Sequence, residues 1–372
     1  MYDRTAGKAE RREGPGPLPE APGAQRADGG PLPAASLPAV DRVRLLGIVL
    51  VLVSACGFGS GALFGKPVYA TGVGWLTLLA WRFLIGAALS WGWLLVSASR
   101  RGGFRAMDRR ALAVSVALGV LYVGNSATYF AALETVPASL AGLIVYVYPA
   151  LVAVLSLWVG VPLEGRRAWG ALGLALVGVV LAVGGIPETD VPPISGLLLV
   201  IASPFIYAVW IVLAARLSGE RSRRGSIEAA DGGGPASGGG EGAATHAAAA
   251  VMMTATAGSF WLMAAASSTP TLPSMIPPEA WPGLVGVGVV ATFLAIQTFY
   301  AGAKRVGAAQ ASLVSTVEPV YTAIMAAILF GERLTPVQLT GGALILSAVV
   351  LAQTSPRGAA RALRSRFRIA DE

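Results

Sequence analysis

Ten apolar runs, each about as long as a membrane-crossing helix, recur along this chain and constrain its fold more than any other feature. A hydrocarbon core of about 30 Å is crossed by about 20 apolar residues in helical form. Only 13% of the 372 residues are charged, against about 25% in soluble domains. We therefore predict an all-α membrane protein with ten transmembrane helices. The predicted spans are 45–63, 75–96, 112–133, 138–158, 169–186, 194–213, 247–266, 284–303, 309–330 and 338–352.

Basic residues gather in alternate connections between the apolar runs. Arginines precede the first run, and basic clusters follow the second, fourth, sixth, eighth and tenth runs, whereas the other connections carry mainly acids. Short cytoplasmic loops hold the excess of Lys and Arg in membrane proteins. This predicts a multi-pass protein of the cytoplasmic (inner) membrane with both termini in the cytoplasm. The net charge of +8 is thus a topological signal, and no nucleic-acid partner is expected.

Composition also divides the chain into segments. Residues 1–44, rich in Pro, Gly and Ala, are expected to form a disordered cytoplasmic tail. Residues 45–186 and 194–353 are predicted to form two five-helix repeats, and the second contains a glycine-rich cytoplasmic linker at 218–245. Residues 354–372 are expected to form a basic cytoplasmic tail that either lies on an anionic lipid surface or is solvated.

An internal repeat relates 130–158 to 300–328 at a constant offset of 170 residues. Its most specific match pairs Pro149 with Pro319. Each half has an odd number of helices, so the second half must enter the bilayer from the opposite side. Inverted repeats with interrupted helices at matching positions indicate a midplane substrate site and alternating access. Proline lacks an N–H and breaks a helix locally, although a simple packing kink is the alternative for both residues.

Two stretches stand out, YFAALETVPASLAGLIVYVYPALVAVLS in the first half and GAKRVGAAQASLVSTVEPVYTAIMAAILFGERLTPVQLTGGALIL in the second. They resemble the EamA-type transporters of the drug/metabolite transporter superfamily. The resemblance implies a ten-helix bundle with a central pocket between the halves. It also implies export of amino acids, metabolites or toxic compounds, with no enzyme activity. The first half departs from the pattern, because VPLEGRR stands where the second half has GER.

Glu318 is the leading candidate for a functional residue. It lies near the middle of a predicted span, where a charged group is costly and needs a reason. It shares a helical face with Ser315 and Thr322 at a spacing of i, i+3, i+7. We expect it to bind an ammonium group or to carry a proton as the coupling ion. The alternative is a buried structural ion pair with Arg82.

Two basic side chains are further candidates. Arg82 lies inside the second predicted span, and its planar fork suits a substrate carboxylate. The alternative is that its side chain extends to the interface or pairs with a loop acid. Lys66 lies at the extracytoplasmic edge of the first span, where it either acts as a gate or substrate contact or reaches the interface.

Polar and aromatic side chains inside other spans are expected to line the substrate pocket. Amide and hydroxyl groups in hydrocarbon require hydrogen-bond partners, which neighbouring helices or a ligand can supply. The residues in this group are Asn125, Tyr129, Tyr148, Ser203, Tyr207, Trp210 and Gln297.

Enzymatic chemistry finds little support in the sequence. His246 is the single histidine and Cys56 the single cysteine, so no metal site, catalytic triad or cofactor is expected. A membrane enzyme would need clustered acids or a paired nucleophile and base, and a passive channel would need a polar ring.

We therefore predict a secondary transporter that moves a small metabolite, an amino acid or an amphiphilic drug-like compound, by alternating access. Export is favoured because the resemblance implies it. A sugar-nucleotide or other metabolite carrier is the alternative. A phosphate-rich ligand should demand several basic pocket residues, and only Arg82 and Lys66 are available.

Overall fold

The computed structural model divides the chain into two units, Met1–Pro38 and Ala39–Glu372. The first unit, most of the expected linker and the C-terminal tail lie outside the described residues. The residues that the structure describes are 39–96, 105, 107–158, 165–187, 191–217 and 239–353.

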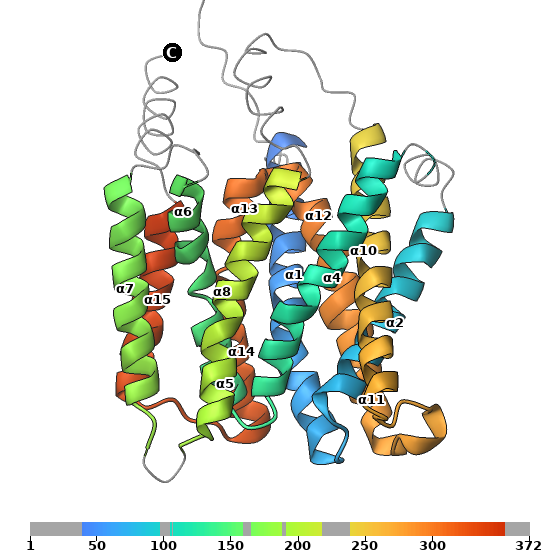
Figure 1. The fold of residues 1–372 in the computed structure, drawn as a ribbon. Coiled ribbons are helices and arrows are strands. Elements are labelled where there is room, and N and C mark those ends of the chain that lie inside the picture. The colour runs from blue at the N-terminus through green and yellow to red at the C-terminus, as the bar shows by residue number, and fades with distance from the viewer. Residues whose placement is uncertain are drawn as a thin grey trace, which may run out of the picture. The chain divides into compact units, whose positions relative to one another are not determined.

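The described residues form helices and connecting turns, with no strand among them (Figure 1). Helices occupy every apolar run expected to cross the membrane. In the first part of the chain they are α1 (Ala39–Ala70), α2 (Trp75–Val96), α4 (Arg109–Ala132), α5 (Ala138–Val145), α6 (Tyr148–Trp158), α7 (Gly165–Gly184) and α8 (Ile194–Leu217). The remaining elements are α10 (Gly239–Ala266), α11 (Trp281–Gly288), the π-helix η4 (Val289–Leu294), α12 (Ala295–Val306), α13 (Ala308–Val314), α14 (Val317–Phe330) and α15 (Pro336–Gln353), with short 3₁₀ turns η2 (Pro273–Met275) and η3 (Pro278–Ala280).

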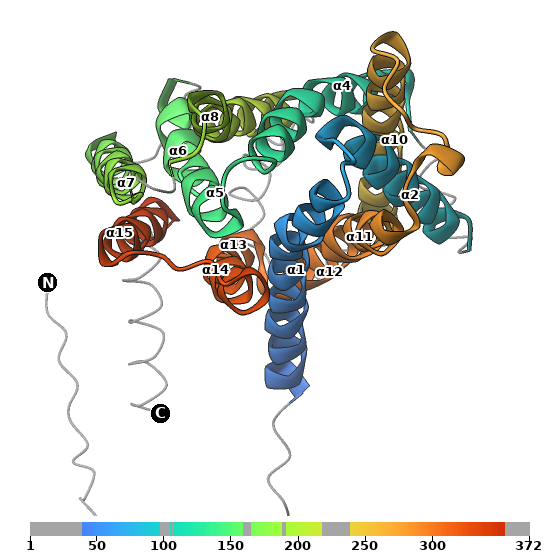
Figure 2. The ribbon, with the colours of Figure 1, turned by 90° about the horizontal axis from the view of Figure 1, so that it is seen from below.

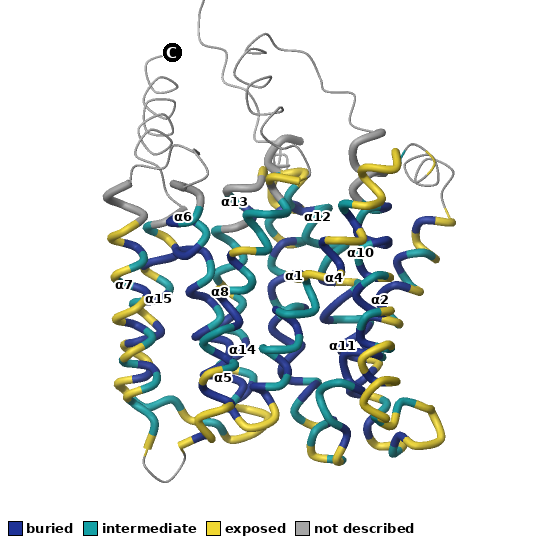
Figure 3. The backbone as a smooth tube through the Cα atoms, viewed as in Figure 1, coloured by how far each residue is buried: buried dark blue, intermediate teal, exposed yellow. Residues whose placement is uncertain are grey.

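Seven helical segments are long and apolar enough to cross a membrane, and the segments 169–184, 317–330 and 336–351 are shorter apolar helices. Many large apolar residues of these helices are exposed, and Figure 3 marks exposed residues along the backbone in yellow. Leu262 is 73% exposed, and Val180 and Ile328 are each 69% exposed. Apolar surface on this scale is unfavourable in water and favourable against lipid chains. The prediction of an all-α membrane protein is confirmed.

Two helices begin earlier than the composition indicated. α1 starts at Ala39, inside the segment 1–44 that was expected to be a disordered tail, and α10 starts at Gly239, inside the expected linker 218–245. Pro38 sets the first limit, since a helix rarely continues back through a proline. An alanine-rich stretch follows Gly239, and alanine is the best helix former.

Three of the predicted spans are interrupted, two of them at the prolines where the sequence predicted a break. The run 138–158 breaks at Tyr146 and Val147 between α5 and α6, and the run 309–330 breaks at Ser315 and Thr316 between α13 and α14. These breaks lie just before Pro149 and Pro319, which have no N–H to donate to the carbonyl four residues earlier. The third span, 284–303, changes from α- to π-helix at η4.

The helices pair side by side, as the view in Figure 2 shows. α7 pairs with α15 at one edge, where Gly178 and Gly341 bring the two backbones together; a Cβ atom on Gly178 would lie 2.7 Å from the Gly341 carbonyl oxygen. α10 lies against α2 and α4, and α4 also contacts α8. α1 contacts α11, η4, α12 and α14, and α14 contacts α5.

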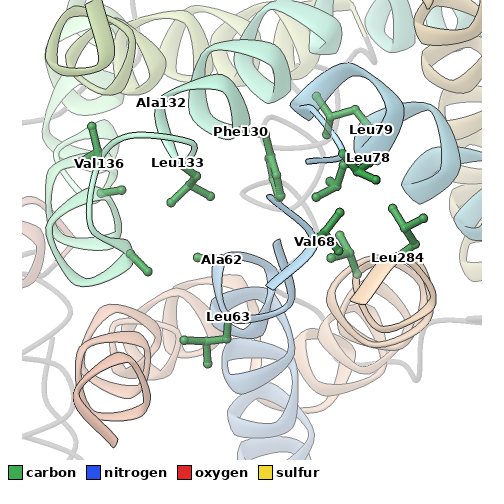
Figure 4. Packing of buried hydrophobic residues seen from close by; sticks show 14 of the residues in the cluster. Ala62, Leu63, Val68, Leu78, Leu79, Phe130, Ala132, Leu133, Val136 and Leu284 are labelled. Atoms are coloured by element: carbon green, nitrogen blue, oxygen red, sulfur yellow. The ribbon is translucent and has the colours of Figure 1, made fainter. Parts of the chain in front are cut away.

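The main core joins α1, α2, α4, α5, α10 and α11, and Figure 4 shows part of it. Val68, Leu78, Leu79, Leu133 and Leu284 have no exposed surface there. In a bilayer such packing holds helices together through close contact, because lipid tails are as apolar as leucine. This core fixes α1 and α2, which carry residues of the candidate site.

Candidate functional site

The two proline-linked helix breaks contact each other. Tyr146, at the break between α5 and α6, donates from its hydroxyl to the carbonyl oxygen of Ser315 at 2.6 Å. The same hydroxyl donates to Oε2 of Glu318 at 2.9 Å. These contacts connect residues 169 and 172 positions apart in the chain. The repeat-related segments therefore meet at their interruptions.

The Ser315 carbonyl is available for this contact because of Pro319. In a regular helix the N–H four residues later would bond to it, and proline has none. The carbonyl instead accepts from Glu318 N at 3.0 Å and from the Tyr146 hydroxyl. A tyrosine hydroxyl has a single hydrogen, which the Ser315 carbonyl and the Glu318 carboxyl must share.

Tyrosine hydroxyl groups from several helices interact electrostatically with Glu318. Its carboxyl interacts electrostatically with Tyr129 of α4, Tyr148 of α6 and Tyr207 of α8, and with Cys56 of α1. Glu318 and the three tyrosines are all partly exposed. Side chains from four helices thus interact electrostatically with one acid.

The rings of α4, α6 and α8 form a continuous aromatic surface beside this acid. The Tyr148 and Tyr207 centroids are 4.7 Å apart, and Tyr207 stacks on Trp210 at 5.9 Å. Tyr122 completes the group, 5.1 Å from Trp210, and Tyr146 lies 5.8 Å from Tyr148. We call Tyr122, Tyr146, Tyr148, Tyr207 and Trp210 the aromatic wall. Aromatic faces attract cations through their quadrupole.

Some predicted pocket residues bond to each other or to the backbone. The Ser203 hydroxyl donates to Oδ1 of Asn125 at 3.1 Å, and both residues are buried. Trp210 donates from Nε1 to the carbonyl oxygen of Leu118 at 2.8 Å. These bonds join α4 to α8, so these polar groups stabilise helix packing whether or not they also contact a ligand.

Ser315, Glu318 and Thr322 do not lie along one unbroken helix, which corrects the expected helical face. The break falls between Ser315 and Glu318. Thr322 is buried, and its hydroxyl donates to the carbonyl oxygens of Glu318 at 3.0 Å and Gly59 at 3.3 Å. Its methyl group also lies against Gly142. Thr322 therefore sits where α14 packs between α1 and α5.

Arg82 does not pair with Glu318, so the alternative of a structural ion pair between them finds no support among the described residues. Arg82 is only 8% exposed, and its Nε donates to Oγ1 of Thr292 at 2.9 Å. Its guanidinium carbon lies 4.6 Å from the ring centroid of Phe130 and 5.0 Å from that of Phe83. Two aromatic rings and one hydroxyl hold the cation inside the bundle.

Lys66 and Gln297 are the remaining predicted site residues. Lys66 interacts electrostatically with Glu332. The Glu332 carboxylate accepts from Ala138 N and Ser139 N, each at 2.9 Å, and from the Ser139 hydroxyl at 2.6 Å. It thus caps the start of α5. In α12, Gln297 has a buried Oε1 that meets no donor among the residues described.

No group of three or more His, Cys, Asp or Glu side chains is placed to hold a metal ion in the described part of the chain. The chemistry that these residues offer is binding: one acid beside aromatic rings, and one cation between two phenylalanines.

Comparison with known proteins identifies the family. The model of the EamA-like transporter family matches residues 45–184 and 241–354, more than half of the chain. The chain belongs to the EamA-like transporter family. An "uncharacterized transporter" of Archaeoglobus fulgidus (strain ATCC 49558 / DSM 4304 / JCM 9628 / NBRC 100126 / VC-16) is 28% identical over 229 residues, which cover 61% of this chain and 71% of that protein.

A solved crystal structure shares the fold of this EamA-family chain, with a TM-score of 0.54 and 21% sequence identity. The match covers 84% of this chain and 96% of that one. The resemblance stated from sequence is confirmed, and the chain is a membrane transporter of small molecules by family.

Sequence reasoning missed several residues of this EamA-family site. Tyr146 lies three residues before Pro149 in YVYP. The helix break predicted there could have indicated that its side chain contacts another helix. Glu332 lies in the GER stretch, which was noted as a motif only. Thr292 and Tyr122 stand in unbroken apolar runs, where no local pattern distinguishes them.

Proposed function

We propose that this chain is a secondary transporter that exports an amino acid or a related amphiphilic metabolite by alternating access. The contact of Tyr146 with Ser315 and Glu318 carries the proposal. It places an acid where two interrupted helices meet, the arrangement in which transporters of inverted-repeat design hold their substrates.

The proposed architecture has ten transmembrane helices in two inverted five-helix repeats, 45–186 and 194–353. Seven helical segments have the length and hydropathy of spans, and the three shorter apolar helices would complete the ten. The paired breaks, separated by about the repeat offset, support the relation between halves. We assign both termini, the linker 218–245 and the basic tail 354–372 to the cytoplasmic side of the inner membrane, on the strength of the arginine distribution.

The substrate would be held at two poles. Glu318 and the aromatic wall suit an ammonium group, through charge and cation–π attraction. Arg82 suits a carboxylate, since a guanidinium presents several parallel N–H donors. Tyr129 interacts electrostatically with both charged residues and is proposed as a further contact for the substrate. Asn125, Ser203, Ser315, Thr322, Gln297 and Lys66 are proposed as further lining or gating residues.

Proton coupling would act through the shared hydrogen of Tyr146. With Glu318 ionised, its carboxylate competes with the Ser315 carbonyl for that hydrogen. A protonated Glu318 has its own hydrogen to donate, so the Tyr146 hydroxyl can bond fully to Ser315. An arriving ammonium group would displace the proton. The Glu318 carboxyl group would then hold either a proton or the ammonium group of the substrate, but not both.

The test is uptake into inside-out membrane vesicles and proteoliposomes, with three related compounds. L-leucine has both charges, L-leucinamide lacks the carboxylate, and 4-methylpentanoate lacks the ammonium group. We expect leucine to be moved best, with loss of transport in Glu318→Gln. The proposal would be contradicted if the wild-type protein moved leucine and 4-methylpentanoate equally well. It would also be contradicted if the protein moved neither compound but took up a sugar nucleotide.

A further inference from the structure

Thr292 is the direct partner of Arg82. The residue is 1% exposed, and it lies in the π-helical segment η4 between α11 and α12. Its Oγ1 accepts the Nε–H of Arg82 at 2.9 Å across a separation of 210 residues. The contact therefore joins α2 of the first half to η4 of the second.

The π-helix determines where the Thr292 hydroxyl points. Thr292 donates to the carbonyl oxygen of Val287, five residues earlier, at 2.9 Å. Thr254, Thr298 and Thr340 donate instead to carbonyls four residues earlier, as in ordinary α-helices. Such π segments are rare and occur often at functional sites.

The hydrogen count fixes the direction of the Arg82 contact. A threonine hydroxyl has one hydrogen, and Thr292 donates it to Val287. The oxygen can then only accept from Arg82, whose guanidinium only donates. Bonding at Nε leaves the two terminal nitrogens free to turn together toward a ligand, and among the described residues neither makes a hydrogen bond.

The methyl group of Thr292 also packs against α2. Gly86 lies one helical turn after Arg82, and a Cβ atom there would approach Thr292 Cγ2 to 2.8 Å. The missing side chain of Gly86 thus admits the threonine methyl while Arg82 bonds to its hydroxyl. The rings of Phe83 and Phe130 also lie close to the guanidinium.

From this geometry we infer that Thr292 is a positioning residue that orients the Arg82 guanidinium toward a substrate carboxylate. The inference rests on the proposed function, because it takes Arg82 as the carboxylate contact. It adds that the specificity for a carboxylate depends on a hydroxyl presented by a π-helical turn of the other half.

The test compares Thr292→Val, Thr292→Ser and Arg82→Gln in proteoliposomes, with the ratio of half-saturating concentrations for L-leucinamide and L-leucine as the readout. Valine keeps the shape of threonine without its hydroxyl, and serine keeps the hydroxyl. Arg82→Gln should abolish the preference for leucine. Thr292→Val should reduce it about tenfold, comparable to one hydrogen bond to a charged group. Thr292→Ser should keep the preference for leucine within about twofold of that of the wild type.

The outcomes separate the two claims. An unchanged preference in Arg82→Gln would contradict the carboxylate role in the proposed function. Loss of the preference in Arg82→Gln but not in Thr292→Val would overturn the role of Thr292 alone. Should Thr292→Val fail to fold, Thr292→Ala removes the same hydroxyl with less bulk against Gly86.

A second readout needs no substrate. In protein labelled with ¹⁵N-arginine, the Nε–H signal of Arg82 can be assigned by its loss in Arg82→Gln. It should be protected from hydrogen exchange in the wild type and in Thr292→Ser, and exposed in Thr292→Val. Equal exchange rates in the wild type and Thr292→Val would overturn the inference.

Discussion

The Tyr146 hydroxyl oxygen lies 2.9 Å from Oε2 of Glu318, so a tyrosine at one helix break meets an acid beside the other. Each break precedes a proline, at Pro149 and Pro319. The contact thus joins two segments that correspond to each other in the proposed inverted repeat. A change in the protonation or ligation of Glu318 would alter contacts in both halves, because Tyr146 of the first half bonds to Glu318 and to Ser315 of the second.

Tyr146→Phe tests this contact. The change leaves the Ser315 carbonyl with one donor fewer, which should lower the free energy of unfolding by about 1 to 2 kcal/mol. Tyr69→Phe is a matched control, since the Tyr69 hydroxyl donates to a backbone carbonyl, that of Phe130, at 2.8 Å. We expect similar thermal destabilisation of both variants in detergent and a change in the pH dependence of transport only for Tyr146→Phe. The same transport profile in both variants would argue against a special role for Tyr146.

Glu332→Ala should weaken the junction between the start of α5 and the chain after α14. The carboxylate accepts three hydrogen bonds there, two of them from backbone N–H groups at the helix start. Loss of such a cap costs about 2 kcal/mol. Glu134→Ala is the control, because Glu134 is exposed and accepts from Trp75 N. Thermal unfolding should show the larger loss for Glu332→Ala, and equal losses would contradict this account.

Gly178→Ala tests the pairing of α7 with α15. The added methyl group would lie 2.7 Å from the Gly341 carbonyl oxygen, so the helices must separate, at a cost of about 1 to 3 kcal/mol. Gly173→Ala in the same helix meets nothing within 4 Å and should be neutral or stabilising by about 0.5 kcal/mol. Unfolding midpoints measured for both variants decide the matter. Indistinguishable midpoints would show that the two helices do not approach closely.

The proposed topology makes a prediction at the termini. Reporter fusions at residues 3 and 370 should both be active as cytoplasmic reporters, because basic residues cluster in the connections on that side. Either reporter appearing outside the cytoplasm would contradict the proposed topology.

Much of the fold could be predicted because the thickness of the apolar membrane core sets both the length of an apolar run and the length of the helix that it forms. The run 75–96 was predicted with the ends that α2 has in the structure. The helix ends near Ala39 and Gly239 were missed, because they depend on local propensity beyond the apolar run. The interruptions were foreseen only where a proline indicated them, and η4 contains none.

The candidate site was predicted in part. Glu318 and Arg82 stood out because charge inside an apolar run is costly, which is a local property of the sequence. Their partners could not be found in the same way. Tyr146 and Thr292 reach them across 172 and 210 residues, and such contacts depend on how the halves pack.

The most direct measurement is transport by Glu318→Gln, compared with its thermal stability in detergent. The substitution removes the charge with little change of volume, and no ion pair to Arg82 is lost among the described residues. We therefore expect the unfolding temperature to stay close to that of the wild type, while flux of L-leucine in proteoliposomes is abolished or loses its dependence on a proton gradient. A stable protein with undiminished, proton-dependent transport would contradict the central role given to Glu318. Destabilisation by about 3 to 5 kcal/mol would instead indicate a structural ion pair.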